Sequence, residues 1–215
     1  MGSKPRKKAR GAYHHGDLEQ ALLEAALATI RREGVQGLTL RGVGTQLGVS
    51  RTALYRHFED KAALVARVAL EGFRLFYEAL AGAIARAAET GGDPLEEMGR
   101  AYVRFALANQ AHYQTMFGGY LLDWGKYPDL SSQAQATFML LVDSVRDAQR
   151  LGRLGPGEPV ELAEIIWALS HGISTLGAAR QLDRTGAGVE ELMVMACRAF
   201  TAGLRPLASA HPGRS

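Results

Sequence analysis

The side chains best suited to chemistry gather in one short segment, residues 49–61, with the sequence VSRTALYRHFEDK. Residues 51–57 supply two guanidinium groups, a phenol and an imidazole, from Arg51, Tyr55, Arg56 and His57. Arginine pairs with guanine edges or phosphates, whereas hydroxyl and imidazole groups donate to phosphates or contact thymine methyl groups. The segment therefore indicates a surface that contacts DNA.

Helix-start signals around this segment predict two short helices joined by a tight turn. Thr39 is placed to cap a helix over residues 40–47, and Gly48 is suited to the turn that follows it. Ser50 is placed to cap the second helix, over residues 51–57. The few apolar residues of the segment are then enough to anchor this second helix, and its other side chains remain available to DNA.

Longer helices are expected on both sides of the short pair. A helix over residues 18–33 is predicted from an apolar stripe of helical spacing, with Asp17 and Gln20 as its capping box. Asp60 is placed to cap a long helix over residues 61–88. A long helix followed by two short ones is the layout of a helix-turn-helix, whose second short helix enters the major groove.

The charge of the chain is uneven, although its net value is only +3. Residues 1–61 hold 11 Lys and Arg against 6 Asp and Glu, and the remaining residues hold 14 against 16. No acid precedes Asp17, so a basic, disordered tail over residues 1–16 is expected, as is a disordered tail over residues 208–215. The basic tail is either an arm that contacts DNA or a solubilising or cloning remnant.

The motifs LTLRGVGTQLGVS and LYRHFEDKAALV, within residues 18–68, resemble the DNA-binding domain of the TetR family of bacterial repressors. The resemblance implies that Thr39, Arg41 and Lys61 contact phosphates and that the recognition helix carries the remaining contacts. Gly44 departs from the alanine usual in this family where the short helices cross, but it still permits their close approach. The complete set of expected DNA-contacting residues is Thr39, Arg41, Ser50, Arg51, Thr52, Tyr55, Arg56, His57 and Lys61.

The rest of the chain is predicted to be a helical body, because good helix formers dominate it and no strand-like alternation is sustained. After the helix that starts at residue 61, Gly- and Pro-rich breaks divide it into further segments. These are expected over residues 94–109, 111–117, 129–151, 159–182 and 188–206. The fold class is therefore all-α, with a helix-turn-helix domain over residues 17–62 and a ligand-binding and dimerisation domain over residues 63–207.

The last two predicted helices are apolar on more than one side. Ile165 and Leu176 share a stripe that differs from the one holding Trp167, and Met195 and Cys197 lie on different faces of the final helix. Such helices can pack on the core with one face and on a second copy with the other. A homodimer with a four-helix-bundle interface is expected, and TetR-like proteins dimerise in this way.

The body also resembles a subgroup of TetR-family ligand-binding domains named for a Trp-His-Gly signature, here Trp167, His171 and Gly172 in the sequence WALSHGIST. This resemblance implies a cavity for a small hydrophobic effector, and the scarcity of acids among the candidate residues favours a neutral or anionic one. Each aromatic residue could equally be plain core, and His171 could be a core or interface histidine. The expected ligand-contacting residues are Phe105, Tyr113, Met116, Phe117, Phe138, Leu141, Trp167 and His171.

Other classes of function lack the required motifs. No zinc-hydrolase, nucleophile-elbow or phosphate-loop pattern is present, so no catalytic residue, metal site or cofactor is expected. No apolar run is long enough to cross a membrane, and Cys197, the only cysteine, cannot form an internal disulfide, which favours a cytoplasmic protein.

The expected function is that of a ligand-responsive regulator. Such a protein would bind a palindromic operator as a dimer, most simply as a repressor, and a hydrophobic effector would release it. An activator and a constitutive architectural DNA binder remain as alternatives.

Overall fold

The computed structural model describes residues 15–120, 122–182, 186 and 188–203. The described part is all-helical, as predicted, and the chain divides into two compact units, one ending at Leu64 and the next beginning at Val65. Both predicted terminal tails fall outside the described residues.

The first unit opens with α1 (His15–Gly37). The prediction that this helix begins at Leu18 with Asp17 as its cap was wrong, because the backbone is already helical from His15. Gly34 interrupts α1 with a φ of 72°, so the regular helix ends where the sequence predicts, and a short helical stretch follows the kink. A left-handed φ is readily adopted only by glycine.

The two short helices are confirmed as α2 (Leu40–Leu47) and α3 (Arg51–His57). Their predicted caps are also confirmed, because Thr39 Oγ1 accepts from the Gly42 N–H at 3.0 Å and Ser50 Oγ accepts from the Ala53 N–H at 3.2 Å. Gly48 ends α2 with a φ of 64°. These local hydrogen bonds stabilise the helix starts that present the side chains of both helices.

The two short helices cross closely at Gly44, as the sequence predicts. A Cβ at this position would lie 3.1 Å from Cδ2 of Leu54 and 3.7 Å from a methyl group of Val49. Leu54 and Phe58 are buried, and they anchor α3 while its other face remains exposed. The turn and the crossing together fix the outward orientation of α3.

The fourth helix, α4 (Lys61–Thr90), begins in the first unit and provides the long helix of the second. The Asp60 carboxylate accepts from the Ala63 N–H at 2.7 Å, as predicted for a cap. The second unit continues with α5 (Pro94–Ala108), α6 (Gln110–Phe117), the 3-10 helix η1 (Trp124–Lys126), α7 (Pro128–Arg150), α8 (Pro159–Ala178) and α9 (Val189–Gly203).

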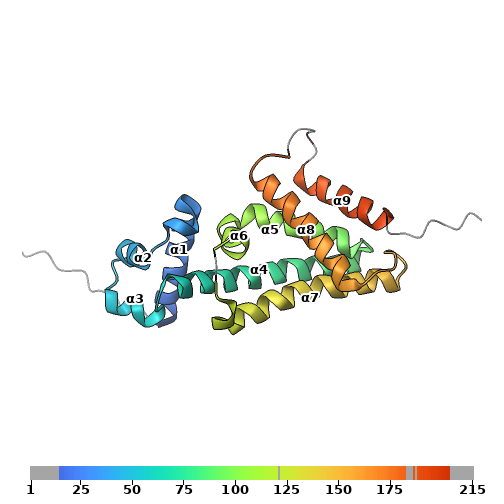
Figure 1. Ribbon diagram of the computed structural model, residues 1–215. Helices are drawn as coiled ribbons and strands as arrows, with labels where there is room; N and C mark the ends of the chain where they lie inside the picture. The colour runs from blue at the N-terminus through green and yellow to red at the C-terminus, as the bar shows by residue number, and fades with distance from the viewer. Residues whose placement is uncertain (1–14, 121, 183–185, 187, 204–215) are drawn as a thin grey trace, which may run out of the picture. The chain divides into compact units, whose positions relative to one another are not determined.

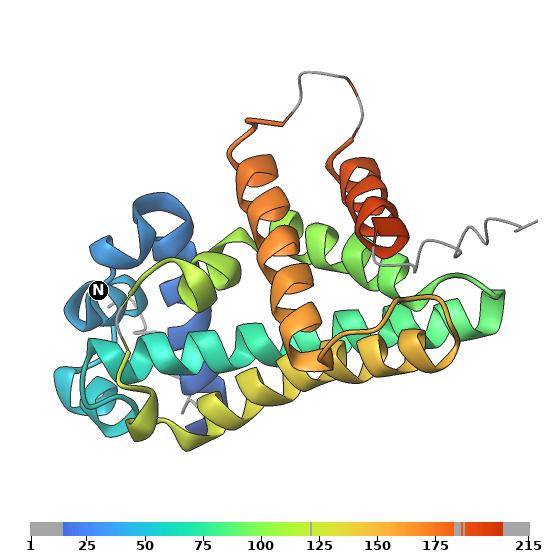
Figure 2. The ribbon, with the colours of Figure 1, turned by 45° about the vertical axis from the view of Figure 1, so that its right-hand side comes forward.

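Within this unit α7 runs beside the main part of α4, and α8 and α9 both pack on α5, as Figures 1 and 2 show. Its core is built from apolar side chains of α4 to α8, with Val103, Met193 and Cys197 joining α5 to α9. None of the helices that the structure describes is long and apolar enough to span a membrane.

Proline at the first turn starts α5, α7 and α8, where its missing N–H is not needed by the helix. The end of α8 differs from the prediction, since the helix stops at Ala178 rather than at residue 182. Arg180 adopts a left-handed φ of 55°, and the Gln181 N–H turns back to the Leu176 carbonyl at 2.9 Å. Arg180 rather than a glycine occupies the left-handed position, so the sequence lacks the usual glycine signal for this stop.

Candidate DNA-binding surface and ligand cavity

The outer face of α3 is polar and exposed. Arg51, Thr52, Tyr55 and Arg56 are exposed, and His57 is half-buried. The guanidinium carbon of Arg51 lies 5.4 Å from the centre of the Tyr55 ring, a cation–π contact that pairs two of the expected DNA-contacting side chains. The face therefore presents donors and a cation rather than an apolar surface.

Three further groups that are expected to contact DNA lie near α3 in the first unit. Arg41 is exposed on α2, and the hydroxyls of Thr39 and Ser50 accept the N-cap hydrogen bonds. A hydroxyl that accepts through its oxygen still has its O–H to donate, so both caps can serve a phosphate as well. The short helices thus bring these groups into one region.

Lys61 has a different setting, since it is half-buried at the start of α4. Its Nζ donates to the carbonyl oxygen of Gln36 at 3.0 Å, which fastens the start of α4 to the end of α1. An ammonium group has three donors, so this bond is compatible with the predicted phosphate contact.

A cavity of about 230 Å³ lies within the second unit. Aromatic rings from six elements line it: Phe73, Phe76, Tyr102, Phe117, Trp124, Phe138 and Trp167. Aliphatic and thioether side chains add Leu80, Leu95, Met98, Met116, Leu141 and Ile166. The remaining lining residues are small or weakly polar: Gly99, Ala134, Thr137, Ser170 and Cys197. None of these described residues carries a formal charge.

The few hydroxyl groups in this wall are already engaged. Thr137 Oγ1 donates to the Gln133 carbonyl at 2.8 Å, and Ser170 Oγ lies 3.7 Å from the Met193 sulfur. Burial raises the pKa of the Cys197 thiol to about 11, and the carboxylates of Glu96 and Asp93 add to the shift. The wall is therefore apolar, with a protonated thiol at neutral pH.

Five of the eight expected ligand-contacting residues line the cavity, namely Met116, Phe117, Phe138, Leu141 and Trp167. The other three lie outside its lining. Phe105 is buried beside Phe76, with 4.8 Å between their ring centres. Tyr113 and His171 contact the lining ring of Phe117, at centroid distances of 5.0 and 5.2 Å.

Tyr102, Tyr113 and His171 form a hydrogen-bonded cluster at this wall. The Tyr113 hydroxyl lies 2.7 Å from Nδ1 of His171, and the Tyr102 hydroxyl lies 3.4 Å from each of those two atoms. Burial raises the pKa of both phenols and lowers the pKa of the His171 imidazole. The cluster is therefore uncharged at neutral pH.

Sequence reasoning missed the contribution of α4 and of η1 to the cavity. Phe73, Phe76 and Leu80 follow one another at helical spacing on α4, a signal that could have placed them on one inward face. Trp124 lies in a short 3-10 turn between two helices, and no periodicity marks it. Its position depends on the packing of η1 and α7.

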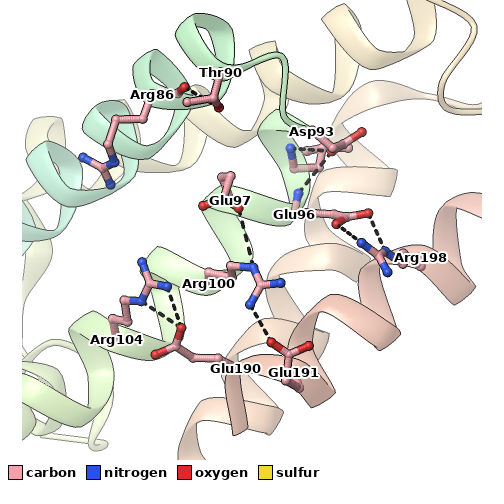
Figure 3. A network of polar contacts seen from close by, with 11 residues as sticks. Arg86, Thr90, Asp93, Glu96, Glu97, Arg100, Arg104, Glu190, Glu191 and Arg198 are labelled. Carbon is pink, nitrogen blue, oxygen red and sulfur yellow. Dashed lines mark hydrogen bonds and ion pairs between the residues drawn. The ribbon is translucent and has the colours of Figure 1, made fainter. Parts of the chain in front are cut away.

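Charged pairs fasten one side of α9 to α5, as Figure 3 shows. The Arg198 guanidinium contacts both carboxylate oxygens of Glu96 at 2.8 Å, Arg100 pairs with Glu191, and Arg104 pairs with Glu190. The buried Met193 and Cys197 of α9 pack with Val103 of α5 in the same interface between the two helices. This leaves the opposite face of α9 exposed.

Large apolar side chains are exposed on both α8 and α9. Ile165 and Leu176 on α8 are 51% and 42% exposed, and Met195 on α9 is 61% exposed. Gly172, between the two α8 residues, has nothing within 4 Å of where a Cβ would be. Large exposed apolar groups on neighbouring helices mark an interaction surface.

Comparison with protein families gives two matches, one in each half of this architecture. Residues 22–68 match the model of bacterial regulatory proteins of the tetR family, and residues 95–200 match a tetracyclin repressor-like C-terminal domain.

The chain belongs to the TetR family.

Several proteins are similar to this TetR-family chain. A protein of unknown function from Rhodococcus sp. RHA1 is 35% identical, with a TM-score of 0.77, over 92% of this chain and all of that one. The fatty acid degradation regulator FadR of Bacillus halodurans shares the fold at 13% identity, with a TM-score of 0.71 over 93% and 99% of the two chains.

A further similarity is to YobS, an uncharacterised HTH-type transcriptional regulator of Bacillus subtilis strain 168. It is 25% identical over 99 residues, which are 46% of this chain and 51% of YobS, so the chain spans about half the length of that relative.

Membership fixes the broad function. TetR-family proteins are transcriptional regulators that bind operator DNA through the helix-turn-helix, and they are not enzymes. Among the described residues no group of three or more His, Cys, Asp or Glu is placed to hold a metal ion.

Proposed function

We propose that this protein is a ligand-responsive repressor, which binds a palindromic operator as a homodimer and is released by a small hydrophobic effector. The cavity of about 230 Å³ carries the proposal, because a protein that only bound DNA would gain stability by filling it. The ligand-binding domain extends over residues 63–207 and the DNA-binding domain over residues 17–62.

The exposed face of α3 supports its role as the recognition helix. Arg51 reads a base edge or a phosphate, while Thr52, Tyr55, Arg56 and His57 complete the contact. Thr39, Arg41, Ser50 and Lys61 hold phosphates on either side. The protein acts in the cytoplasm, where operator DNA is found.

The exposed apolar faces of α8 and α9 support a homodimer. Two copies of this helix pair would form a four-helix bundle and cover Ile165, Leu176 and Met195. A two-fold axis through that bundle presents two recognition helices, so the operator has two inverted half-sites about one DNA turn apart.

The lining of the cavity supports a hydrophobic effector. The effector would contact the lining residues Met116, Phe117, Phe138, Leu141 and Trp167 directly. Behind this wall lie Phe105, Tyr113 and His171, whose rings pack against lining rings. We also place the body in the subgroup with the Trp-His-Gly signature. In this chain Trp167 lines the cavity, and His171 hydrogen-bonds to Tyr113 beside it.

A constitutive architectural DNA binder is the alternative function, and an activator is a variant of the first. The cavity speaks against the architectural alternative, because such a protein has no use for an apolar space lined by aromatic rings. Repression follows if the operator overlaps a promoter.

The test begins with a duplex selected by the purified protein from randomised DNA. An inverted repeat bound by two copies of the chain is the expected result, and small hydrophobic molecules are then screened for release of that duplex. Binding of one copy to an asymmetric site would contradict the dimer, and release by no molecule that occupies the cavity would contradict ligand response.

A further inference from the structure

We infer that the effector is an uncharged aromatic molecule of about ten non-hydrogen atoms, which binds in the aromatic cavity of the second unit. This inference rests on the proposed function, because it names the ligand class of the same cavity. The charge, size and aromatic lining of the cavity each contribute a separate argument.

The lining excludes charged ligands of either sign. Its described residues include no Lys, Arg or His to meet an anion and no Asp or Glu to meet a cation. A buried ion without a partner is costly enough that ionisable groups neutralise instead. The titratable groups of the lining, Tyr102 and Cys197, and the adjacent His171 are all uncharged at neutral pH because burial disfavours their ions. An anionic ligand, which the sequence leaves open, is therefore disfavoured.

The hydroxyl groups of the wall add little polar recognition. The Thr137 hydroxyl donates to a backbone carbonyl, and the Ser170 hydroxyl faces a sulfur atom within the protein. A ligand with several donors would lose its bonds to water and find few acceptors in return. Recognition must then come from shape and apolar contact.

The size of the cavity limits the ligand. An apolar cavity of roughly 150 Å³ in another protein stays dry and binds benzene. At about 230 Å³ this cavity is half as large again, which suits two fused rings. A long acyl chain or a multi-ring drug would exceed this volume and extend beyond the lining residues.

Aromatic rings surround the space from several directions. Phe73 and Phe117 meet edge to face with centroids 5.5 Å apart, and Phe138 and Trp167 meet in the same way at 6.0 Å. Aromatic groups prefer such edge and offset contacts, so a flat ring placed among them extends a pattern that is already present.

The two tryptophans of the chain, Trp124 and Trp167, both line the cavity. Intrinsic tryptophan emission therefore reports on this cavity in the unlabelled full-length protein. The variants Trp124→Phe and Trp167→Phe each leave a single reporter at a known position on the wall.

The probes are indane, indane-2-carboxylate and 2-indanyl-trimethylammonium, which share one ring system and carry charges of 0, −1 and +1. Emission is excited where the indane ring does not absorb, and apparent Kd values are measured at pH 7 and pH 8. Indane should bind with equal affinity at both pH values, because the protein groups at the wall keep the same protonation state.

The carboxylate should bind only as its neutral acid. With a carboxyl pKa of about 4, that form is roughly a thousandth of the total at pH 7, so the apparent Kd should be weaker than that of indane by about a thousandfold. It should weaken by a further tenfold or so from pH 7 to pH 8. The trimethylammonium probe has no neutral form and should not bind.

A matched pair of variants locates the binding. Ala134 lines the cavity on α7, whereas Ala136 is exposed on the same helix. Ala134→Phe should fill the space and abolish the indane response, and Ala136→Phe should leave it intact. Thermal unfolding of both variants without ligand checks that they fold. If Ala134→Phe does not fold, the wild-type titrations with the three probes still decide the outcome.

Equal affinity for indane and either charged probe would overturn the inference, as would the absence of any indane response. These titrations contain no DNA, so their failure is separate from failure of the proposed function. Indane binding without release of the selected duplex would leave the ligand class standing and count against ligand-controlled DNA release.

Discussion

The hydroxyl of Tyr113 on α6 lies 2.7 Å from Nδ1 of His171 on α8, and their rings stack with centroids 5.5 Å apart. The donor of this bond is the phenol if Nδ1 is unprotonated, which fits the lowered pKa of His171. One hydrogen bond thus joins the short helix beside the cavity to the helix that carries the exposed apolar face.

Protonation of His171 should destabilise the protein in acid. Because burial lowers its pKa in the folded state, the unfolded chain binds the proton more readily below about pH 6.5, and stability falls as the pH decreases from there. His171 is only half-buried, so water screens the effect and the loss should be under about 1 kcal/mol by pH 5.5.

Urea unfolding at pH 7.5 and pH 5.5 measures this, with His171→Gln as the comparison. The variant should lose less stability than the wild type over the same interval. Equal losses in the two proteins would assign the pH dependence to other groups.

The crossing of α4 and α6 depends on Gly72. A Cβ there would lie 2.7 Å from Sδ of Met116, a residue that also lines the cavity, and 3.1 Å from Cβ of His112. Gly72→Ala should destabilise the second unit by about 1–3 kcal/mol through overpacking. Combined with Met116→Ala, which removes the shortest contact, the loss should be smaller than the sum of the two single losses by at least about 0.5 kcal/mol.

Gly82→Ala on the same helix is the control. Its Cβ would approach only the flexible end of Arg86, at 3.3 Å, so this variant should gain up to about 1 kcal/mol of helix propensity. Denaturant unfolding of the wild type, Gly72→Ala, Met116→Ala, the double variant and Gly82→Ala gives the comparison. A Gly72→Ala variant as stable as Gly82→Ala would show that α6 moves aside without cost.

The exposed residue Met195 tests the dimer. Met195→Glu would place a carboxylate on the apolar face of α9, where a buried, unpaired charge strongly opposes association. Sedimentation analysis should show monomers for Met195→Glu and dimers for the wild type. Leu151→Glu is the matched control, since Leu151 is similarly exposed but follows α7, and it should remain dimeric.

We expect the exposed side chains of α3 to be of two kinds, those that read a base and those that contact a phosphate. Arg51→Ala should cost about 1–3 kcal/mol of operator affinity and relax the preference at one base position. Tyr55→Ala should weaken binding without changing the consensus, because a phosphate contact carries no sequence information. Arg31→Ala, which removes the same charge from an exposed position on α1, should leave the consensus and nearly all the affinity intact.

Selection from randomised duplexes with each variant checks these roles. An Arg51→Ala consensus identical to that of the wild type would remove Arg51 as a base-reading residue. A changed consensus for Tyr55→Ala would move that residue from the phosphate-contacting group to the base-reading group.

The helix-turn-helix was predictable from the sequence because its signals are local. Thr39 and Ser50 bond to N–H groups three residues away, and Gly48 adopts the left-handed backbone that the turn requires. Such hydrogen bonds and backbone preferences depend on near neighbours in the chain, so residue type and spacing were sufficient. The exposed face of α3 followed from the burial of Leu54 and Phe58.

The full set of residues that lines the cavity depends on tertiary packing and could not be predicted from the sequence. Phe73, Trp124 and Trp167 are far apart in the sequence, and a helical stripe of aromatic residues reads the same whether it fills a core or surrounds a space. Phe105 was expected from its aromatic side chain to contact the ligand, yet it packs behind the wall against Phe76. Cys197, which was not expected there, lines the cavity from α9. Which apolar side chains leave a volume unfilled depends on how the helices cross, and that is a property of the three-dimensional arrangement rather than of any one segment.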